Sequence, residues 1–161
     1  MSAQQNIHQL VAFNLSNEEY GVPITQVQEI VRVPEITHIP GMPHFIEGVI
    51  NLRGKVIPII DLRKRFALEQ KEHSEKTRIV VADAGGQIIG LVVDSVSEVA
   101  QLSQEQIDVM PPSITSIDAQ YLSGVGKMGK RLVILLDLAK LLGDLERVTL
   151  EQVVKKDKQS I

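Results

Sequence analysis

The 161-residue sequence contains no cysteine, so disulfide bonds, thiol nucleophiles and thiolate metal sites are all excluded. Only 3% of its residues are aromatic, whereas 43% are hydrophobic. A core must therefore be built mainly from valine, isoleucine and leucine, and such a composition favours β-strands. The scarcity of aromatic rings also leaves little surface on which nucleic-acid bases could stack.

Positive charge is not in excess either, because the formal net charge is −3 at pH 7. A slightly acidic chain produces no overall field that would attract nucleic acid or anionic lipid. The first residues are polar rather than apolar, and no stretch approaches the roughly 18 apolar residues that a membrane span requires. We therefore expect a cytoplasmic protein without direct insertion into a membrane.

Motifs for catalysis are also missing. The four histidines show none of the spacings typical of metal ligands on a helix, and we interpret them as surface or loop residues: His8, His38, His44 and His73. No glycine-rich segment carries the lysine and hydroxyl side chain of a phosphate-binding loop, and no Gly-x-Ser-x-Gly nucleophile motif is present. We expect no enzymatic activity, no bound metal and no cofactor.

The most informative stretch is a hairpin pattern at residues 48–66, which reads GVINLRGKVIPIIDLRKRF. Apolar runs rich in β-branched residues lie on both sides of Arg53 and Gly54, so we predict two strands joined by a tight turn. Asp61 ends the apolar run and is predicted to cap a short helix. The turn would expose Arg53, and Glu29 is a second charged residue set among apolar neighbours. Each of these two charges is either a solvated surface residue or a contact for a partner.

A similar pattern recurs at residues 124–142, at a constant offset of 76 positions from the first. A second pair of segments, 20–30 and 89–99, matches at an offset of 69 positions. Chance similarity is the alternative explanation, because strand–turn–strand–helix segments are common. Two blocks that occur in the same order favour duplication, and we therefore predict two related β modules in tandem.

The duplicated short strands and glycine turns predict a mainly β fold of two compact barrels with short helices. The polar stretch at residues 67–76 is predicted to connect the two modules. A strand is predicted at residues 8–15. Thr149 and Gln152 form a capping-box pattern that predicts a C-terminal helix.

Four segments resemble the CheW family of bacterial chemotaxis coupling proteins: VQEI at 27–30, EGVINLRGKVIPIIDLR at 47–63, IIGLVVDSVSEV at 88–99 and YLSGVGKMGKRLVILLDL at 121–138. The resemblance implies one domain over residues 8–143, made of two five-stranded SH3-like barrels packed side by side. The barrels are expected at approximately 15–76 and 77–143, with the N-terminal strand able to join the second. Residues 144–161 would form a C-terminal helix and tail.

The resemblance also implies a function, namely a non-enzymatic adaptor that couples methyl-accepting chemoreceptors to the histidine kinase CheA at membrane-bound receptor arrays. Contacts with the cytoplasmic tip of the receptor are expected at Val27, Glu29, Gly48, Arg53, Gly90 and Val99. Contacts with the regulatory domain of the kinase are expected at Gly124, Val125 and Gly126. The alternative is a β-barrel module that binds a small ligand or nucleic acid.

Overall fold

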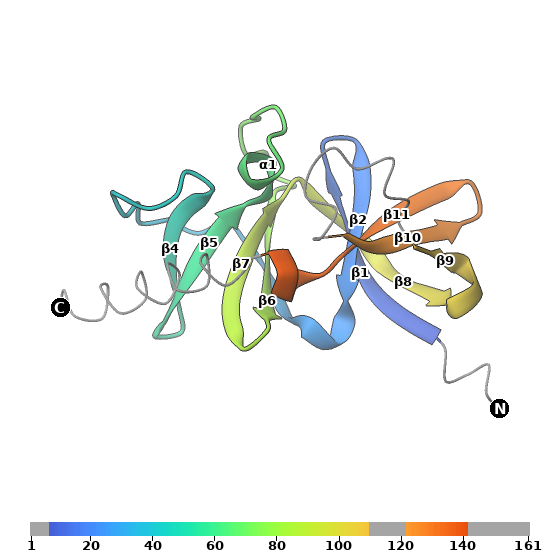
Figure 1. Cartoon of the computed structure of the whole chain (residues 1–161). Coiled ribbons are helices and arrows are strands. Elements are labelled where there is room, and N and C mark those ends of the chain that lie inside the picture. The colour runs from blue at the N-terminus through green and yellow to red at the C-terminus, as the bar shows by residue number, and fades with distance from the viewer. Residues whose placement is uncertain (1–6, 110–121, 142–161) are drawn as a thin grey trace.

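The computed structural model describes residues 7–109 and 122–141, which form mainly β-structure (Figure 1). The strands of this described part belong to two sheets, which lie side by side in Figure 1. The mainly β fold of two SH3-like barrels is thereby confirmed. The predicted C-terminal helix and tail at residues 144–161 lie outside the described residues.

Barrel 1 is a five-stranded sheet with the strand order β3-β6-β7-β5-β4. Its strands are β3 (Val27–Arg32), β4 (Ile46–Leu52), β5 (Lys55–Asp61), β6 (Arg78–Ala84) and β7 (Gln87–Val93). Neighbouring strands are antiparallel except for β5 and β7, which run parallel. The sheet encloses an apolar cluster of its own, formed by Ile50, Ile57, Ile59, Ile79, Val81 and Val92.

Barrel 2 is a sheet with the order β8-β1-β2-β11-β10-β9, so it has six strands rather than the predicted five. Its strands are β1 (Ile7–Leu15), β2 (Glu18–Pro23), β8 (Ser95–Ser103), β9 (Ile107–Asp108), β10 (Leu122–Met128) and β11 (Arg131–Leu136). Here β2 and β11 form the parallel pair. A smaller apolar cluster lies inside this barrel, formed by Leu10, Leu102, Val133 and Leu135.

The helices of the described residues are short, as predicted. They are η2 (Ile24–Gln26), α1 (Leu62–Arg65) and η3 (Gln104–Gln106), with a further helical turn at 138–141. The Asp61 side chain accepts hydrogen bonds from the amides of Arg63 and Lys64, which confirms the predicted cap of α1. Asp137 caps the turn at 138–141 in the same way, because its Oδ1 accepts a hydrogen bond from the Lys140 amide at 3.1 Å.

The two barrels are not consecutive halves of the chain, and the predicted division between residues 76 and 77 is wrong. Strands β6 and β7 pair with β3 and β5 in barrel 1, whereas β1 and β2 pair with β8 and β11 in barrel 2. The N-terminal strand therefore joins the second barrel, as the alternative allowed. The polar stretch at 67–76 is a surface loop within barrel 1, since polar composition reflects exposure and does not by itself mark a domain boundary.

Strand register supports the duplication inferred from the sequence. Ile59 lies opposite Gly90 in barrel 1, and the positions related to them by the two offsets, Leu135 and Gly21, lie opposite each other in barrel 2. The bulges at residues 47 and 123 also correspond, at the offset of 76. The first hairpin of each repeat, β1–β2 or β6–β7, therefore completes the barrel of the other repeat.

The largest apolar cluster includes residues from both barrels. Four of the five aromatic residues belong to it: Phe13, Tyr20, Phe45 and Phe66. Tyr20 stacks on Phe13 with ring centroids 6.0 Å apart and on Phe66 with centroids 5.9 Å apart. These stacked rings connect the β1–β2 hairpin of barrel 2 to the end of α1 in barrel 1, so the scarce aromatic residues are concentrated where the barrels meet.

Candidate functional site

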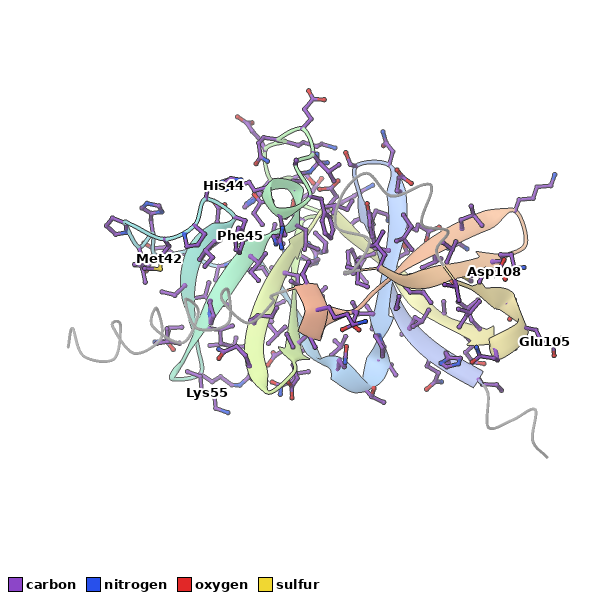
Figure 2. The ribbon with its side chains drawn as sticks, viewed as in Figure 1. Met42, His44, Phe45, Lys55, Glu105 and Asp108 are labelled. Carbon is purple, nitrogen blue, oxygen red and sulfur yellow. The ribbon has the colours of Figure 1, made fainter. Side chains whose placement is uncertain are left out.

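The β4–β5 turn presents Arg53 at one tip of barrel 1. Arg53 and Gly54 have φ angles of 52° and 85°, so both central residues adopt the left-handed conformation of a type I′ hairpin turn. The Asn51 side chain accepts a hydrogen bond from the Gly54 amide at 2.8 Å and fixes the turn further. Figure 2 shows Lys55, the next residue, at this tip, far from Glu105 and Asp108 of barrel 2.

Arg53 forms a two-point ion pair with Glu29 on β3. Its Nη1 donates to Oε1 at 3.1 Å, and its Nη2 donates to Oε2. The hydrogen bonds from Arg53 lower the pKa of Glu29, and the carboxylate in turn raises the pKa of Arg53, so both groups are charged at neutral pH. The Arg53 side chain is nevertheless 72% exposed. Exposed ion pairs add little to stability, so this pair is better suited to recognition.

A groove of about 460 Å³ surrounds this ion pair. It is lined by Gln28, Glu29, Leu52, Arg53, Gly54, Lys55, Val56, Ile57, Gly86, Gln87 and Ile88. The groove thus lies between the β4–β5 and β6–β7 turns and combines apolar walls with the paired charges of Arg53 and Glu29 and the charge of Lys55. A guanidinium group has five N–H donors, so Arg53 can bind a partner's carboxylate or carbonyl while it stays paired with Glu29.

Gly48 and Gly90, also predicted as receptor contacts, are buried rather than part of this groove. Gly48 has a φ angle of 153°, and a Cβ atom there would collide with the carbonyl oxygen of Thr37. A Cβ atom on Gly90 would lie 2.6 Å from Cδ1 of Ile59 and 2.7 Å from Cγ2 of Ile79. Both glycines are therefore required for close packing within barrel 1.

The two predicted valine contacts lie on different barrels. Val27 is half-buried at the start of β3 and packs against the cluster between the barrels, whereas Val99 on β8 is 53% exposed. The counterpart of Val99 in the first repeat is Ile30, which is 40% exposed. Ile30 and Val96 line a second groove, of about 350 Å³, between β3 and β8. Sequence reasoning missed Ile30, although its alignment with Val99 in the repeat could have revealed it.

The predicted kinase contacts lie on β10 of barrel 2. Gly124 and Gly126 are buried and Val125 is half-buried. A Cβ atom on Gly124 would lie 2.7 Å from the carbonyl oxygen of Asp108, and one on Gly126 would collide with the Leu102 side chain. These glycines therefore allow β9 and β8 to pack closely on β10. The structure separates the Arg53–Glu29 pair and the β10 segment onto different barrels.

The histidines do not gather into a site. The Nε2 of His8 lies 2.9 Å from Oε1 of Gln104, and His44 packs edge-on against Phe45 in the loop before β4 (Figure 2). Within residues 7–109 and 122–141, no group of three or more histidine or carboxylate side chains could hold a metal ion. In that same part of the chain, no helix is long and apolar enough to cross a bilayer.

Comparison with known proteins identifies the family. A family model described as "CheW-like domain" matches residues 9–146. The "Chemotaxis protein CheW" of Klebsiella aerogenes is 42% identical over 91% of this chain and 89% of its own length, and that of Treponema pallidum is 36% identical over 91% and 88%. The crystal structure of the scaffolding protein TtCheW from Thermoanaerobacter tengcongensis superposes with a TM-score of 0.80 at 40% identity, covering 86% of this chain and 94% of that one. The chain therefore belongs to the CheW-like family of chemotaxis scaffold proteins.

Proposed function

We propose that this protein is a cytoplasmic, non-enzymatic adaptor that couples methyl-accepting chemoreceptors to the histidine kinase CheA. Membership of the CheW-like family supports this role. The structural observation that carries the proposal is the Arg53–Glu29 pair, which is held at an exposed turn beside a groove and adds little to stability.

The receptor tip is proposed to bind along barrel 1 and the neighbouring surface of β8. An amphipathic helical hairpin would place apolar side chains against Val27, Ile30 and Val99, while Arg53 and Glu29 fix its register through charge. Gly48 and Gly90 would contribute indirectly, because their close packing positions β4 and β7, the strands next to the two turns that border the groove.

The regulatory domain of CheA is proposed to bind barrel 2 near Gly124, Val125 and Gly126. The two buried glycines bring β9 and β8 close to β10, so they determine the shape of the surface on which Val125 is only half-buried. With separate partner surfaces on the two barrels, the adaptor could hold receptor and kinase together without any chemistry of its own.

Co-sedimentation with a receptor fragment and CheA, with kinase activity as the readout, tests the proposal. The wild-type protein should bring CheA into the pellet and make its activity depend on the receptor. Arg53→Ala should keep CheA binding but weaken receptor binding by about tenfold or more, as for the loss of an arginine hot spot. Lys71→Ala is the matched control, because it removes an exposed positive charge from the 67–76 loop of barrel 1, and Lys71 does not line the groove. Normal receptor coupling by a folded Arg53→Ala variant would overturn the assignment.

A further inference from the structure

The junction between the barrels contains an ion pair between Arg63 and Asp94. Arg63 belongs to α1 of barrel 1, and Asp94 lies where the chain passes from β7 of barrel 1 to β8 of barrel 2. Arg63 Nε donates to Asp94 Oδ1 at 3.0 Å, and Nη2 donates to Oδ2 at 2.5 Å. A two-point contact of this kind fixes the orientation of both side chains as well as their distance.

Both members of the pair have further partners, and these belong to different barrels. Arg63 Nη1 donates to the carbonyl oxygen of Glu69, in the loop that follows α1. Asp94 Oδ2 accepts a hydrogen bond from the Ser16 amide at 2.9 Å, in the β1–β2 turn of barrel 2. The Asp94 amide donates to the Asn14 carbonyl oxygen, also at 2.9 Å. The pair thus ties α1 and its loop to the crossover and to the β1–β2 turn.

The arginine of this ion pair is much less exposed than Arg53, whereas the side chains of Asp94 and Glu29 are equally exposed. Arg63 is only 8% exposed, and the Asp94 side chain is 26% exposed. Burial alone would raise the pKa of Asp94, but the hydrogen bonds from Arg63 and the Ser16 amide, together with the charge of Arg63, lower it overall. Both groups are therefore charged at neutral pH. Because desolvation offsets the attraction between such partly buried charges, the fixed two-point geometry of the pair matters more here than its net stability.

The residues at the corresponding positions of the other repeat cannot form such an ion pair. At the offset of 69, Asp94 corresponds to Thr25, and at the offset of 76, Arg63 corresponds to Ala139. Barrel 2 forms the same strand register as barrel 1 although Thr25 and Ala139 cannot form such an ion pair. This strand register therefore does not require the ion pair, and the partners of Arg63 and Asp94 in both barrels favour a role at the junction.

We propose that Arg63 and Asp94 form an inter-barrel clamp, and that the adaptor needs this fixed orientation to transmit the state of the receptor to the kinase. The second half of this inference rests on the proposed function, which places the receptor and kinase surfaces on different barrels. Lys55 and Asp108, which mark these two ends, lie far apart in Figure 2, with the junction between them. A small rotation at the junction would therefore displace one partner surface substantially relative to the other.

The variants Arg63→Lys and Asp94→Asn test the clamp. Lysine keeps the charge but cannot form the two-point contact, and asparagine keeps the shape but removes the negative charge. Lys64→Gln is the matched control, because Lys64 is the next residue of α1 and its ion pair with Glu47, at 3.2 Å, lies within barrel 1. Thermal unfolding should show that all three variants fold.

The first readout needs no partner. Because the chain has no cysteine, spin labels can be attached at Lys55→Cys on barrel 1 and Glu105→Cys on barrel 2, and the distance distribution between them measures the barrel orientation. Both clamp variants should broaden or shift this distribution relative to the wild type and Lys64→Gln. An unchanged distribution in both folded clamp variants would overturn the clamp, whatever the partners do.

The second readout is coupling, measured in variants without the labels. Each clamp variant should bind a receptor fragment alone and CheA alone within about threefold of the wild type, yet lose about fivefold or more of the receptor-dependent kinase activation, which is the lower end of typical coupling. Normal activation together with a broadened distance distribution would overturn the need for fixed orientation. If the wild type itself failed to couple receptor to CheA, the proposed function would fall, while the distance measurement would still decide whether the clamp exists.

Discussion

Replacing Gly90 with alanine distinguishes a packing role for this glycine from a direct receptor contact. The added methyl group would lie 2.6 Å from Cδ1 of Ile59 and 2.7 Å from Cγ2 of Ile79, inside the optimal carbon–carbon separation of about 3.5–4.0 Å. Overpacking of a core typically costs about 1–3 kcal/mol of unfolding free energy. At about 2–4 °C per kcal/mol for a chain of this size, the melting temperature should fall by about 2–12 °C.

A second substitution, at Ile59, tests whether the close contact causes the loss of stability. Ile59→Val removes the Cδ1 atom nearest to the new methyl group, at a cost of about 0.5–1.5 kcal/mol when made alone. The double variant Gly90→Ala/Ile59→Val should therefore be more stable than the sum of the two single changes predicts, by about 0.5 kcal/mol or more. Ile60→Val is the matched control, because Ile60 is the next residue of β5 but belongs to the cluster that spans both barrels.

Urea unfolding, followed by far-ultraviolet circular dichroism, measures the free energy of unfolding of all these variants, and receptor binding is measured in parallel. Gly90→Ala combined with Ile60→Val should be additive to within about 0.3–0.5 kcal/mol. Additivity with Ile59→Val as well would refute the packing argument. So would a Gly90→Ala variant of unchanged stability that has lost receptor binding, since that result would make Gly90 a direct contact.

Three further outcomes are expected. Because Arg53 lowers the pKa of Glu29, the ion pair should be intact at any pH above the ordinary glutamate pKa and be lost only as the pH falls through the lowered value. Receptor binding should therefore be equal at about pH 7 and about pH 5.5. Weaker binding at the lower pH would contradict this. Gly124→Glu should lower the melting temperature and weaken CheA binding together, because its Cβ would lie 2.7 Å from the Asp108 carbonyl oxygen; selective loss of CheA binding at normal stability would instead indicate direct contact. The purified protein should not hydrolyse ATP or phosphoesters, and turnover abolished by one histidine or aspartate substitution would contradict the adaptor assignment.

Local features of this fold could be predicted from the sequence because they depend on neighbouring residues. The hairpin around Arg53 and Gly54, and the caps at Asp61 and Asp137, follow from turn and capping chemistry within a few positions. The duplication could be recognised as well. Its three-dimensional form could not, since nothing in the β6–β7 segment itself specifies that it pairs with β3 and β5 rather than with the strands that follow it.

The candidate site was predictable to a similar extent. The structure brings Arg53 and Glu29 together, 24 positions apart in the chain, as the family resemblance led us to expect. A glycine within an apolar segment is harder to interpret. The same sequence pattern arises when the glycine allows buried side chains to pack against the backbone and when it allows a partner to contact the surface. Gly90 is an example, because it packs against Ile59 and Ile79. Asp94 lies inside a segment that carries the family resemblance, but no local pattern connects it to Arg63, 31 positions earlier.

The exchange of hairpins has a consequence for the order of folding. All strands of barrel 1 lie between Val27 and Val93, so this barrel is an uninterrupted stretch, whereas barrel 2 needs β1 and β2 from before it and β8 to β11 from after it. A chain emerging from the ribosome can therefore complete barrel 1 while barrel 2 still lacks its last strands. Once barrel 1 has formed, it holds the two flanking segments close together, which shortens the effective loop that barrel 2 must close. This lowers the entropic cost of long-range contacts in barrel 2, such as that between Glu19 and Arg131, which are 112 positions apart. We expect barrel 1 to fold first and barrel 2 to complete its sheet afterwards, packed against barrel 1.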